Sequence, residues 1–153
     1  MRVVFTMTRN LNLQALIRFP KVMGHTIDST ELPYAPEKLE RKPPVSFDDF
    51  LSLDLKTGTI VDVKDYPKMR KPSYQITVDF GPIVGRLNSS AQITNYAHQD
   101  LIGRKVIGAI NLGEKTLPGG FVSQFLVLGA LEGDGTVKLL EYDASIPNGS
   151  TVL

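Results

Sequence analysis

Glycine is distributed very unevenly along this chain, and this limits what the chain can fold into. Twelve of the thirteen glycines follow residue 46, where they separate short segments rich in β-branched and aromatic residues. Glycine supplies turn conformations that other residues avoid, and such frequent turns leave no room for long helices. No repeat and no alternation of strands with helices is visible. Residues 47–153 are therefore predicted to form one domain of short strands.

The segments between the turns predict a small closed barrel. If residues 54–64 are extended, Leu55, Thr57, Thr59, Val61 and Val63 share one side of the strand. Residues 83–87 follow residues 73–80 closely enough to pair with them as a hairpin. Further strands are expected at residues 105–112, 121–128, 137–142 and 151–153, after tight turns at 133–135 and 147–149. Helical turns are expected at residues 48–53, capped by Asp48 and Asp49, and at residues 91–98.

Residues 1–46 differ from the rest in composition. Four prolines among charges predict an extended linker at residues 28–44, and apolar side chains within residues 11–19 can line a short helix that ends at Pro20. Residues 1–27 carry four basic residues and no acid, which fits an organellar presequence, an upstream extension or a docked arm. We expect residues 1–46 to be a disordered extension with a Pro-rich linker, and residues 47–153 to be the folded domain.

The charge balance changes at the same boundary. Residues 1–46 carry seven Lys/Arg and four Asp/Glu, whereas residues 47–153 carry ten and twelve, a net charge of −2. Any anion-binding surface on the folded domain must therefore be a local patch. No apolar run reaches the roughly 18–20 residues that span a bilayer, and the start lacks a secretory signal. We expect a cytoplasmic protein, with organellar import as the alternative.

Enzyme signatures fail in this sequence. Cysteine is absent, and His25 and His98 lie far apart, so neither a thiol nucleophile nor a histidine-rich metal site is expected. Residues 108–116 resemble a phosphate-binding P-loop, but Glu114 stands where the motif needs lysine and displaces Lys115 by one position. No serine lies in a Gly-x-Ser-x-Gly elbow. We predict no catalytic residue, no metal ligand and no cofactor.

A basic turn is the first candidate binding element. Lys68, Arg70 and Lys71 lie within four residues, and Tyr66 and Tyr74 flank them. If the turn is exposed, its cations can meet phosphates while the aromatic rings stack on bases. A solvated turn without a ligand explains the same residues.

Hydrogen-bonding side chains form the second candidate. Asn88, Ser89, Ser90 and Gln92 lie beside an expected strand end, where they can read a peptide backbone or a nucleotide edge. Loop packing and helix capping are the alternative. Tyr96 can stack on a ligand or plug the barrel, and we favour the plug. Ser123 lies among large apolar residues, which favours a buried hydroxyl bonded to backbone.

Six short blocks, taken in order, resemble the CsaA-like branch of the tRNA-binding domains. They are Asp54–Val61, Tyr66–Pro72, Val78–Gly81, Ser89–Thr94, Gly119–Gly129 and Pro147–Gly149. Within them, Pro67, Arg70 and Pro72 complete the pattern Pro-x-x-Arg-x-Pro of this branch. The sequence departs from the family at Gln124, where Ser-Glu is usual, and at Lys115, where paired arginines are usual. The resemblance covers residues 47–153, and the N-terminal 46 residues have no counterpart.

The resemblance implies an OB-fold, a five-stranded barrel with short helical inserts, and a homodimer formed by C-terminal elements. The candidate residues for that dimer seam are Leu139, Leu140, Tyr142, Ile146 and Val152. It also implies a non-enzymatic, export-related chaperone that binds unfolded or preprotein segments without membrane insertion. The alternative is a tRNA-binding protein whose Arg70, Lys71, Arg86 and Lys115 contact phosphates. A third possibility is an assembly domain that docks on a synthetase.

Overall fold

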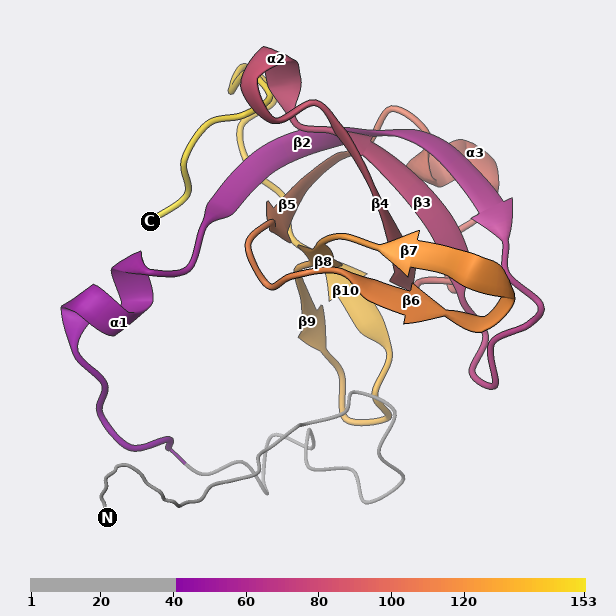
Figure 1. Cartoon of the computed structure of the whole chain (residues 1–153), viewed down its shortest axis with the longest axis horizontal. Helices are drawn as coiled ribbons and strands as arrows, with labels where there is room; N and C mark the ends of the chain where they lie inside the picture. Colours follow the sequence, from indigo (N-terminus) through magenta and orange to yellow (C-terminus); the bar gives the residue numbers. More distant parts are fainter. Residues whose placement is uncertain (1–40) are drawn as a thin grey trace. The chain divides into compact units, whose positions relative to one another are not determined.

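The computed structural model describes residues 41–153 (Figure 1). The expectations for the N-terminal helix, and for nearly all of the proline-rich linker, concern residues outside this range. Within residues 41–153, no helix is long and apolar enough to cross a membrane.

A five-stranded antiparallel sheet forms the body of the domain. Its strands run in the order β4 (Arg86–Ala91), β3 (Tyr74–Asp79), β2 (Leu55–Asp65), β5 (Lys105–Ala109) and β8 (Leu126–Val127). The sheet curls so that its two ends approach: the amide of Gln124, just before β8, donates to the carbonyl of Asn88 in β4 at 2.7 Å. This nearly closed barrel confirms the OB-type fold predicted from the sequence.

The long central strand β2 is broken by a β-bulge. Its pairing with β3 shifts register between Ile60 and Asp62, so Val61 has no partner. The expectation that Leu55, Thr57, Thr59, Val61 and Val63 share one side of the strand is therefore wrong. Leu55 and Thr57 are buried, the burial then passes to Ile60, and it returns to Val63 after the bulge. The bulge lets one strand bend around the barrel while it keeps apolar residues inside.

Phe80 fills the centre of the barrel. It is fully buried, and its ring meets Phe125 edge-to-face with centroids 5.0 Å apart. Gly58 and Gly108 face this ring from β2 and β5, where an added Cβ would lie 2.9 Å and 2.7 Å from ring carbons of Phe80. Both glycines are present because the aromatic ring occupies the space of a side chain.

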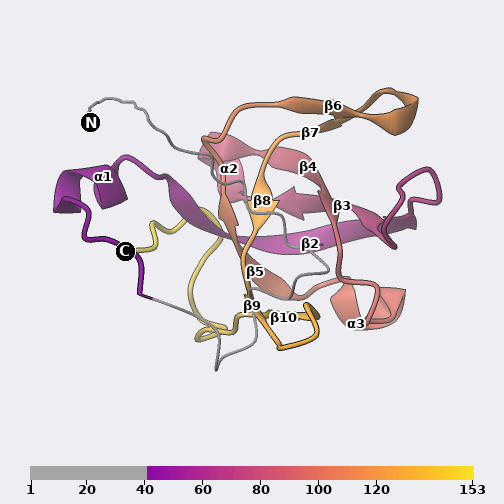
Figure 2. The same cartoon turned by 90° about the horizontal axis from the view of Figure 1, so that it is seen from below.

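Two small hairpins extend from the barrel. One pairs β6 (Lys115–Leu117) with β7 (Phe121–Ser123) through the 3₁₀ turn Pro118–Gly120, and it lies along β4 (Figures 1 and 2). The other pairs β9 (Gly129–Leu131) with β10 (Val137–Leu139) through the expected glycine turn. The single strand expected at residues 121–128 is thus split at Gln124 and Phe125, where the chain crosses from the hairpin back into the barrel.

The helices are single turns, and their limits differ from those expected. The first, α1 (Phe47–Leu51), is capped by Ser46, whose hydroxyl accepts from the amide of Asp49 at 3.0 Å, and not by Asp48 and Asp49. The turn α2 (Gly81–Val84) occupies the start of the segment expected as a strand, and β4 begins only at Arg86. The helix expected at residues 91–98 is wrong, since α3 (His98–Leu101) begins where that segment ends.

The C-terminal segment bonds to the first part of β2, along the edge that β3 does not reach. The amide of Gly149 donates to Thr57 at 2.7 Å, that of Val152 donates to Leu55 at 2.9 Å, and Thr151 bridges to Lys56. This segment passes very close to the start of α2. Gly149 lies against the residue that precedes Gly81, and Gly81 lies against the residue that precedes Gly149. A Cβ added to Gly149 would lie 2.7 Å from the carbonyl oxygen of Phe80.

We predict that Gly149→Ala destabilises the domain more than Gly113→Ala does. Both residues have a φ near +88°, so both substitutions introduce the same backbone strain, but Gly113 has open space around it. The clash at Gly149 should lower the free energy of unfolding by a further ~1–3 kcal/mol, measured by urea titration. Equal losses for the two variants would show that the contact of Gly149 with Phe80 is looser than described.

Candidate functional site

The β6–β7 hairpin joins the two candidate binding elements. At its tip, the hydroxyl of Tyr66 donates to the carbonyl of Pro118, and the rings of Tyr66 and Phe121 lie 5.3 Å apart. The aliphatic part of Lys68 lies against Gly119, where an added Cβ would be 2.9 Å from the Cδ of the lysine. At its base, the hairpin meets Asn88, Ser89 and Ser90 of β4, which together with Ser123 and Gln124 we call the polar cluster. The basic turn and the polar cluster therefore belong to one surface.

Asn88 and Gln124 form the outer part of the polar cluster. The amide of Asn88 donates to the Oε1 of Gln124 at 3.0 Å, and the Oδ1 of Asn88 accepts from Thr77 at 2.8 Å. The Nε2 of Gln124 donates to the Oε2 of Glu114 at 3.1 Å. The family's usual glutamate at position 124 would face the Glu114 carboxylate here. Gln124 forms a hydrogen bond with Glu114, whereas a glutamate at position 124 would be repelled by it.

Three serines form the inner part of the cluster. Ser89 is 1% exposed, and its hydroxyl donates to the carbonyl of Phe125 at 2.7 Å. Ser123 donates to the hydroxyl of Ser89 and accepts from the amide of Ser90, both at 3.4 Å. These bonds connect β4 to β7 and to the chain before β8. We assign Ser89 a structural role, because no ligand can reach it in this conformation.

The expected stacking aromatics are not at the surface. Tyr66 is 4% exposed and Tyr74 is 8% exposed, and the Tyr74 hydroxyl donates to the carbonyl of Tyr96 at 2.8 Å. Both rings are buried and cannot stack on bases of a bound nucleic acid, so their expected role in base stacking is wrong. Tyr96 is half-buried against the core, and its hydroxyl accepts from the amide of Leu139 at 3.1 Å. This arrangement agrees with the plug that the sequence favoured.

Four of the predicted cations are exposed and available. Within residues 41–153, Lys68, Arg70, Arg86 and Lys115 make no ion pair with an acidic side chain, whereas Lys71 is half-buried and already engaged. Lys68 and Arg70 lie at the β2–β3 turn, Lys115 is paired with Ser123 in the hairpin, and Arg86 begins β4. The β2–β3 turn lies near the Ala91 end of β4, so Arg86 is roughly 17 Å away along the strand.

Two hollows flank Tyr66 and Pro67 beside this surface. One has a volume of about 300 Å³, with Gln75 and Phe121 in its wall. The other has a volume of about 480 Å³, with Arg70 in its wall. Gln92 lies half-buried just after β4. No group of three or more acidic or histidine side chains within residues 41–153 is arranged to hold a metal ion.

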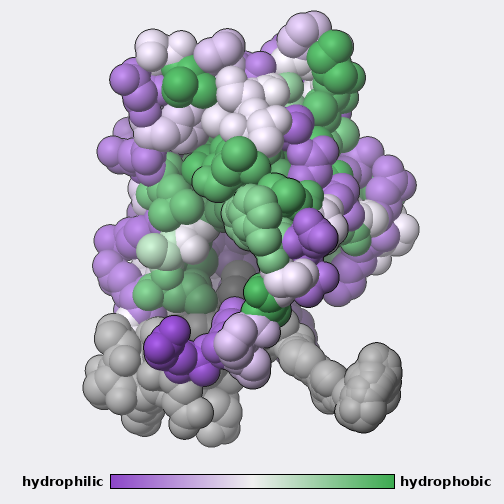
Figure 3. All heavy atoms as spheres, turned by 90° about the vertical axis from the view of Figure 1, so that its left-hand side faces the viewer, coloured by the Kyte–Doolittle hydropathy of each residue, from purple (hydrophilic) through white to green (hydrophobic). Residues whose placement is uncertain are grey.

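A second surface, apolar in character, lies on the side of α1 and the C-terminus (Figure 3). We call it the apolar face. On this side, α1 exposes Phe47 and Phe50, and the chain end exposes Leu153. Leu126 in β8 is also exposed, and it pairs with Ala109, whose partner in β2 is Leu55 at the start of that strand. α1 was not among the predicted binding elements, although the three-residue spacing of the two phenylalanines places them on one side of a helical turn, with rings 6.2 Å apart.

The predicted dimer seam is only partly available for contacts. Leu139 is 6% exposed and belongs to the barrel core, so its place in a seam is wrong. Tyr142 and Val152 are half-buried against Leu55, and burial raises the pKa of the Tyr142 hydroxyl. Leu140 and Ile146 remain exposed.

Comparisons with known proteins agree with this geometry. The family described as "Putative tRNA binding domain" matches residues 55–151. The chain is 35% identical over 142 residues to a methionine–tRNA ligase of Protochlamydia amoebophila and 38% identical over 108 residues to that of Thermococcus onnurineus. The matches cover 93% and 71% of this chain but only 19% and 14% of the two ligases. The chain thus spans less than a fifth of the length of these relatives. The first match extends into residues 1–46, so the expectation that this segment has no counterpart is wrong.

Two solved structures match over their whole length. The CsaA chaperone protein of Picrophilus torridus is 40% identical, with a TM-score of 0.67, and the match covers 72% of this chain and 100% of that one. The chaperone CsaA of Bacillus anthracis is 37% identical, with a TM-score of 0.64 and the same coverage. The barrel, the polar cluster and these matches together show that the chain belongs to the tRNA-binding-domain family, as a CsaA-like member.

Proposed function

We propose that this protein is a non-catalytic, homodimeric chaperone that binds extended apolar segments of unfolded proteins or preproteins. The observation that carries this proposal is the apolar face, where large side chains stand exposed on a small domain. Phe47 is 68% exposed, Leu153 is 82% exposed and Leu126 is 48% exposed. The full-length correspondence with two CsaA chaperones supports the same function.

The apolar face offers surface both for a second copy and for a client segment. A contiguous exposed apolar area on a small protein marks an interaction surface. A two-fold dimer would bring two copies of α1 and of the C-terminal segment together and duplicate any groove beside them. We therefore place the dimer seam at α1, Leu140 and Ile146, and the client contacts on the apolar side chains next to it.

Replacing both Phe47 and Phe50 with serine should weaken dimerisation and peptide binding. The double variant removes two exposed rings whose burial stabilises a contact by roughly 1.5–3 kcal/mol each. We expect a shift from dimer to monomer in sedimentation at low micromolar concentration, and at least tenfold weaker binding of an unfolded apolar peptide. The control is Ile83→Ser, which removes an apolar side chain that is 95% exposed on α2. Equal effects of the control and the double variant would contradict the proposal.

A second candidate function is tRNA binding. It is favoured by the available cations at the basic turn, the hairpin and the start of β4, and by the family to which the chain belongs. Lys68 and Lys115 lie on the surface that the hairpin organises, so phosphates of a folded RNA can contact both. Glu114 lies beside Lys115 on the same surface, which limits the strength of such binding.

We expect the variant Lys68→Gln with Lys115→Gln to weaken tRNA binding and to reduce its salt dependence. The slope of log K against log salt should decrease by about 2, because two phosphate contacts are lost. The matched control is Lys64→Gln with Lys138→Gln, since these two lysines pair with Asp62 and Glu132. Binding should be read by filter retention at two salt concentrations. Identical slopes for both variants would reject the phosphate contacts.

A further inference from the structure

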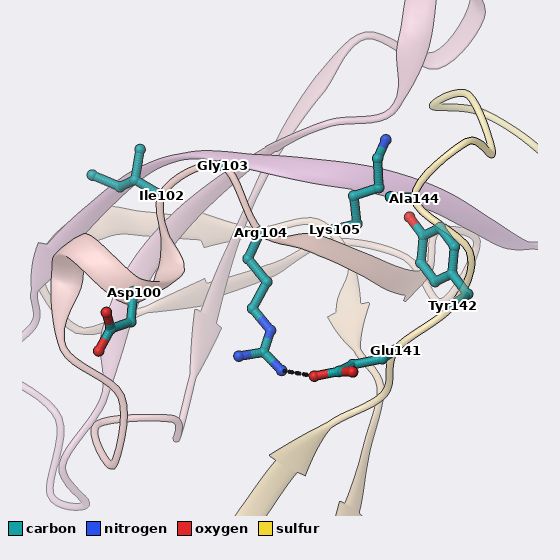
Figure 4. A pocket seen from close by; sticks show the side chains of 8 residues that line it. All are labelled: Asp100, Ile102, Gly103, Arg104, Lys105, Glu141, Tyr142 and Ala144. Atoms are coloured by element: carbon teal, nitrogen blue, oxygen red, sulfur yellow. Dashed lines mark hydrogen bonds and ion pairs between the residues drawn. The ribbon is translucent and has the colours of Figure 1, made fainter.

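A cleft on another part of the barrel has no role in the surfaces described so far. It lies between the turn that follows α3, the start of β5 and the segment after β10 (Figure 4). Its volume is about 510 Å³, which is in the range of small-ligand sites. Arg104 extends across it, and Ile102, 51% exposed, supplies an apolar wall. We call it the Arg104 cleft.

Arg104 is held in place before any ligand arrives. Its guanidinium lies 4.8 Å from the centre of the Tyr96 ring, and that tyrosine is fixed by its bonds to Leu139 and Tyr74. The backbone of Arg104 is also fixed, because its carbonyl accepts from Ile60 at 2.9 Å. A positioned guanidinium loses little freedom when it binds a second group.

One carboxylate already forms an ion pair with this guanidinium. The Oε2 of Glu141 lies 3.2 Å from an Nη of Arg104, while the Glu141 side chain is 82% exposed and that of Arg104 is 22% exposed. An ion pair with one partner so exposed contributes little to stability, so it opens easily. The geometry shows that Arg104 accepts a carboxylate, and the weak, exposed ion pair offers little resistance to exchange of Glu141 for another carboxylate.

The charges around the cleft distinguish between ligand classes. Asp100 and Glu141 stand on either side of Arg104 (Figure 4). The two acids balance the charges of Arg104 and of Lys105, which also lines the cleft and donates to the carbonyl of Ile146 at 3.2 Å, so the cleft has no excess of positive charge for a chain of phosphates. A single carboxylate next to an apolar group suits the cleft better, because it can replace Glu141 on Arg104 while its neighbour contacts Ile102.

We propose that the Arg104 cleft binds a carboxylate of a peptide, either an acidic side chain or the C-terminal carboxylate, in exchange for Glu141. This inference rests on the peptide-binding function proposed above, for which it adds a chemical preference. Clients that carry a carboxylate beside apolar residues are bound better than neutral ones.

A nuclear magnetic resonance titration of the full chain tests the cleft separately from chaperone function. The two probes are N-acetyl-leucine and N-acetyl-leucinamide, which differ only in the carboxylate. N-acetyl-leucine should shift the backbone amides of residues 102–105 and 141–144 in a saturable manner, and the amide probe should bind at least about fivefold more weakly. Equal binding of the two probes would overturn the proposal. So would tighter binding of inorganic phosphate at the same amides.

Two variants give opposite expected results. Arg104→Gln should remove the advantage of N-acetyl-leucine over its amide. Glu141→Gln removes the internal competitor and should strengthen N-acetyl-leucine binding about twofold to threefold. A merely structural ion pair predicts no such gain, so unchanged or weaker binding in Glu141→Gln overturns the exchange. If an unfolded apolar peptide does not bind while N-acetyl-leucine still titrates the cleft, the chaperone function fails and the carboxylate site stands.

Peptide titrations then distinguish the two sources of the carboxylate. One apolar peptide is used in three forms: capped and neutral, capped with one internal glutamate, and with a free C-terminus. We expect at least one acidic form to bind more tightly than the neutral form, and Arg104→Gln to abolish the difference. Equal binding of all three forms to the wild-type chain would contradict a carboxylate preference.

Discussion

The burial of one aromatic ring, that of Phe80, organises much of this domain. The ring needs the space that Gly58 and Gly108 leave in β2 and β5, and it packs edge-to-face on Phe125. Phe125 stands where the chain passes from the β6–β7 hairpin into β8, so the same contact positions the hairpin. Gly149 also packs closely against the backbone of Phe80, and this contact brings the C-terminal segment onto β2. Fold, hairpin and chain end therefore depend on one packing arrangement.

The hairpin and the chain end give the domain two surfaces of different chemistry. The hairpin ties the basic turn to the polar cluster through Tyr66 and Ser123, and it leaves Lys68 and Lys115 exposed. The apolar face lies instead around α1 and the C-terminal segment. Most side chains of the polar cluster bond to one another. On the surface around the hairpin, the groups that a ligand can reach are therefore the exposed cations. Apolar contacts are concentrated on the second.

The sequence could predict the barrel because turn residues and strand segments are local features. It could not predict the bulge at Val61, because a bulge depends on how the partner strand β3 is paired. Nor could it predict that Tyr66 and Tyr74 are buried, since their bonds go to Pro118 and Tyr96, which are distant in sequence. The cations are visible in the sequence by residue type, but whether they are free of ion pairs depends on where the acidic residues lie in the fold. The remaining candidate site residues stay predictions.

Hydrogen exchange of the full chain, with and without an unfolded apolar peptide, tests the central claim most directly. The claim is that clients bind at the apolar face and not at the basic surface. We expect new protection in β8 and the C-terminal segment, next to the proposed dimer seam at α1, with the amides of residues 66–73 and 115–123 unchanged. Protection confined to the basic turn and the β6–β7 hairpin would contradict this account and would favour the RNA-binding surface as the main site.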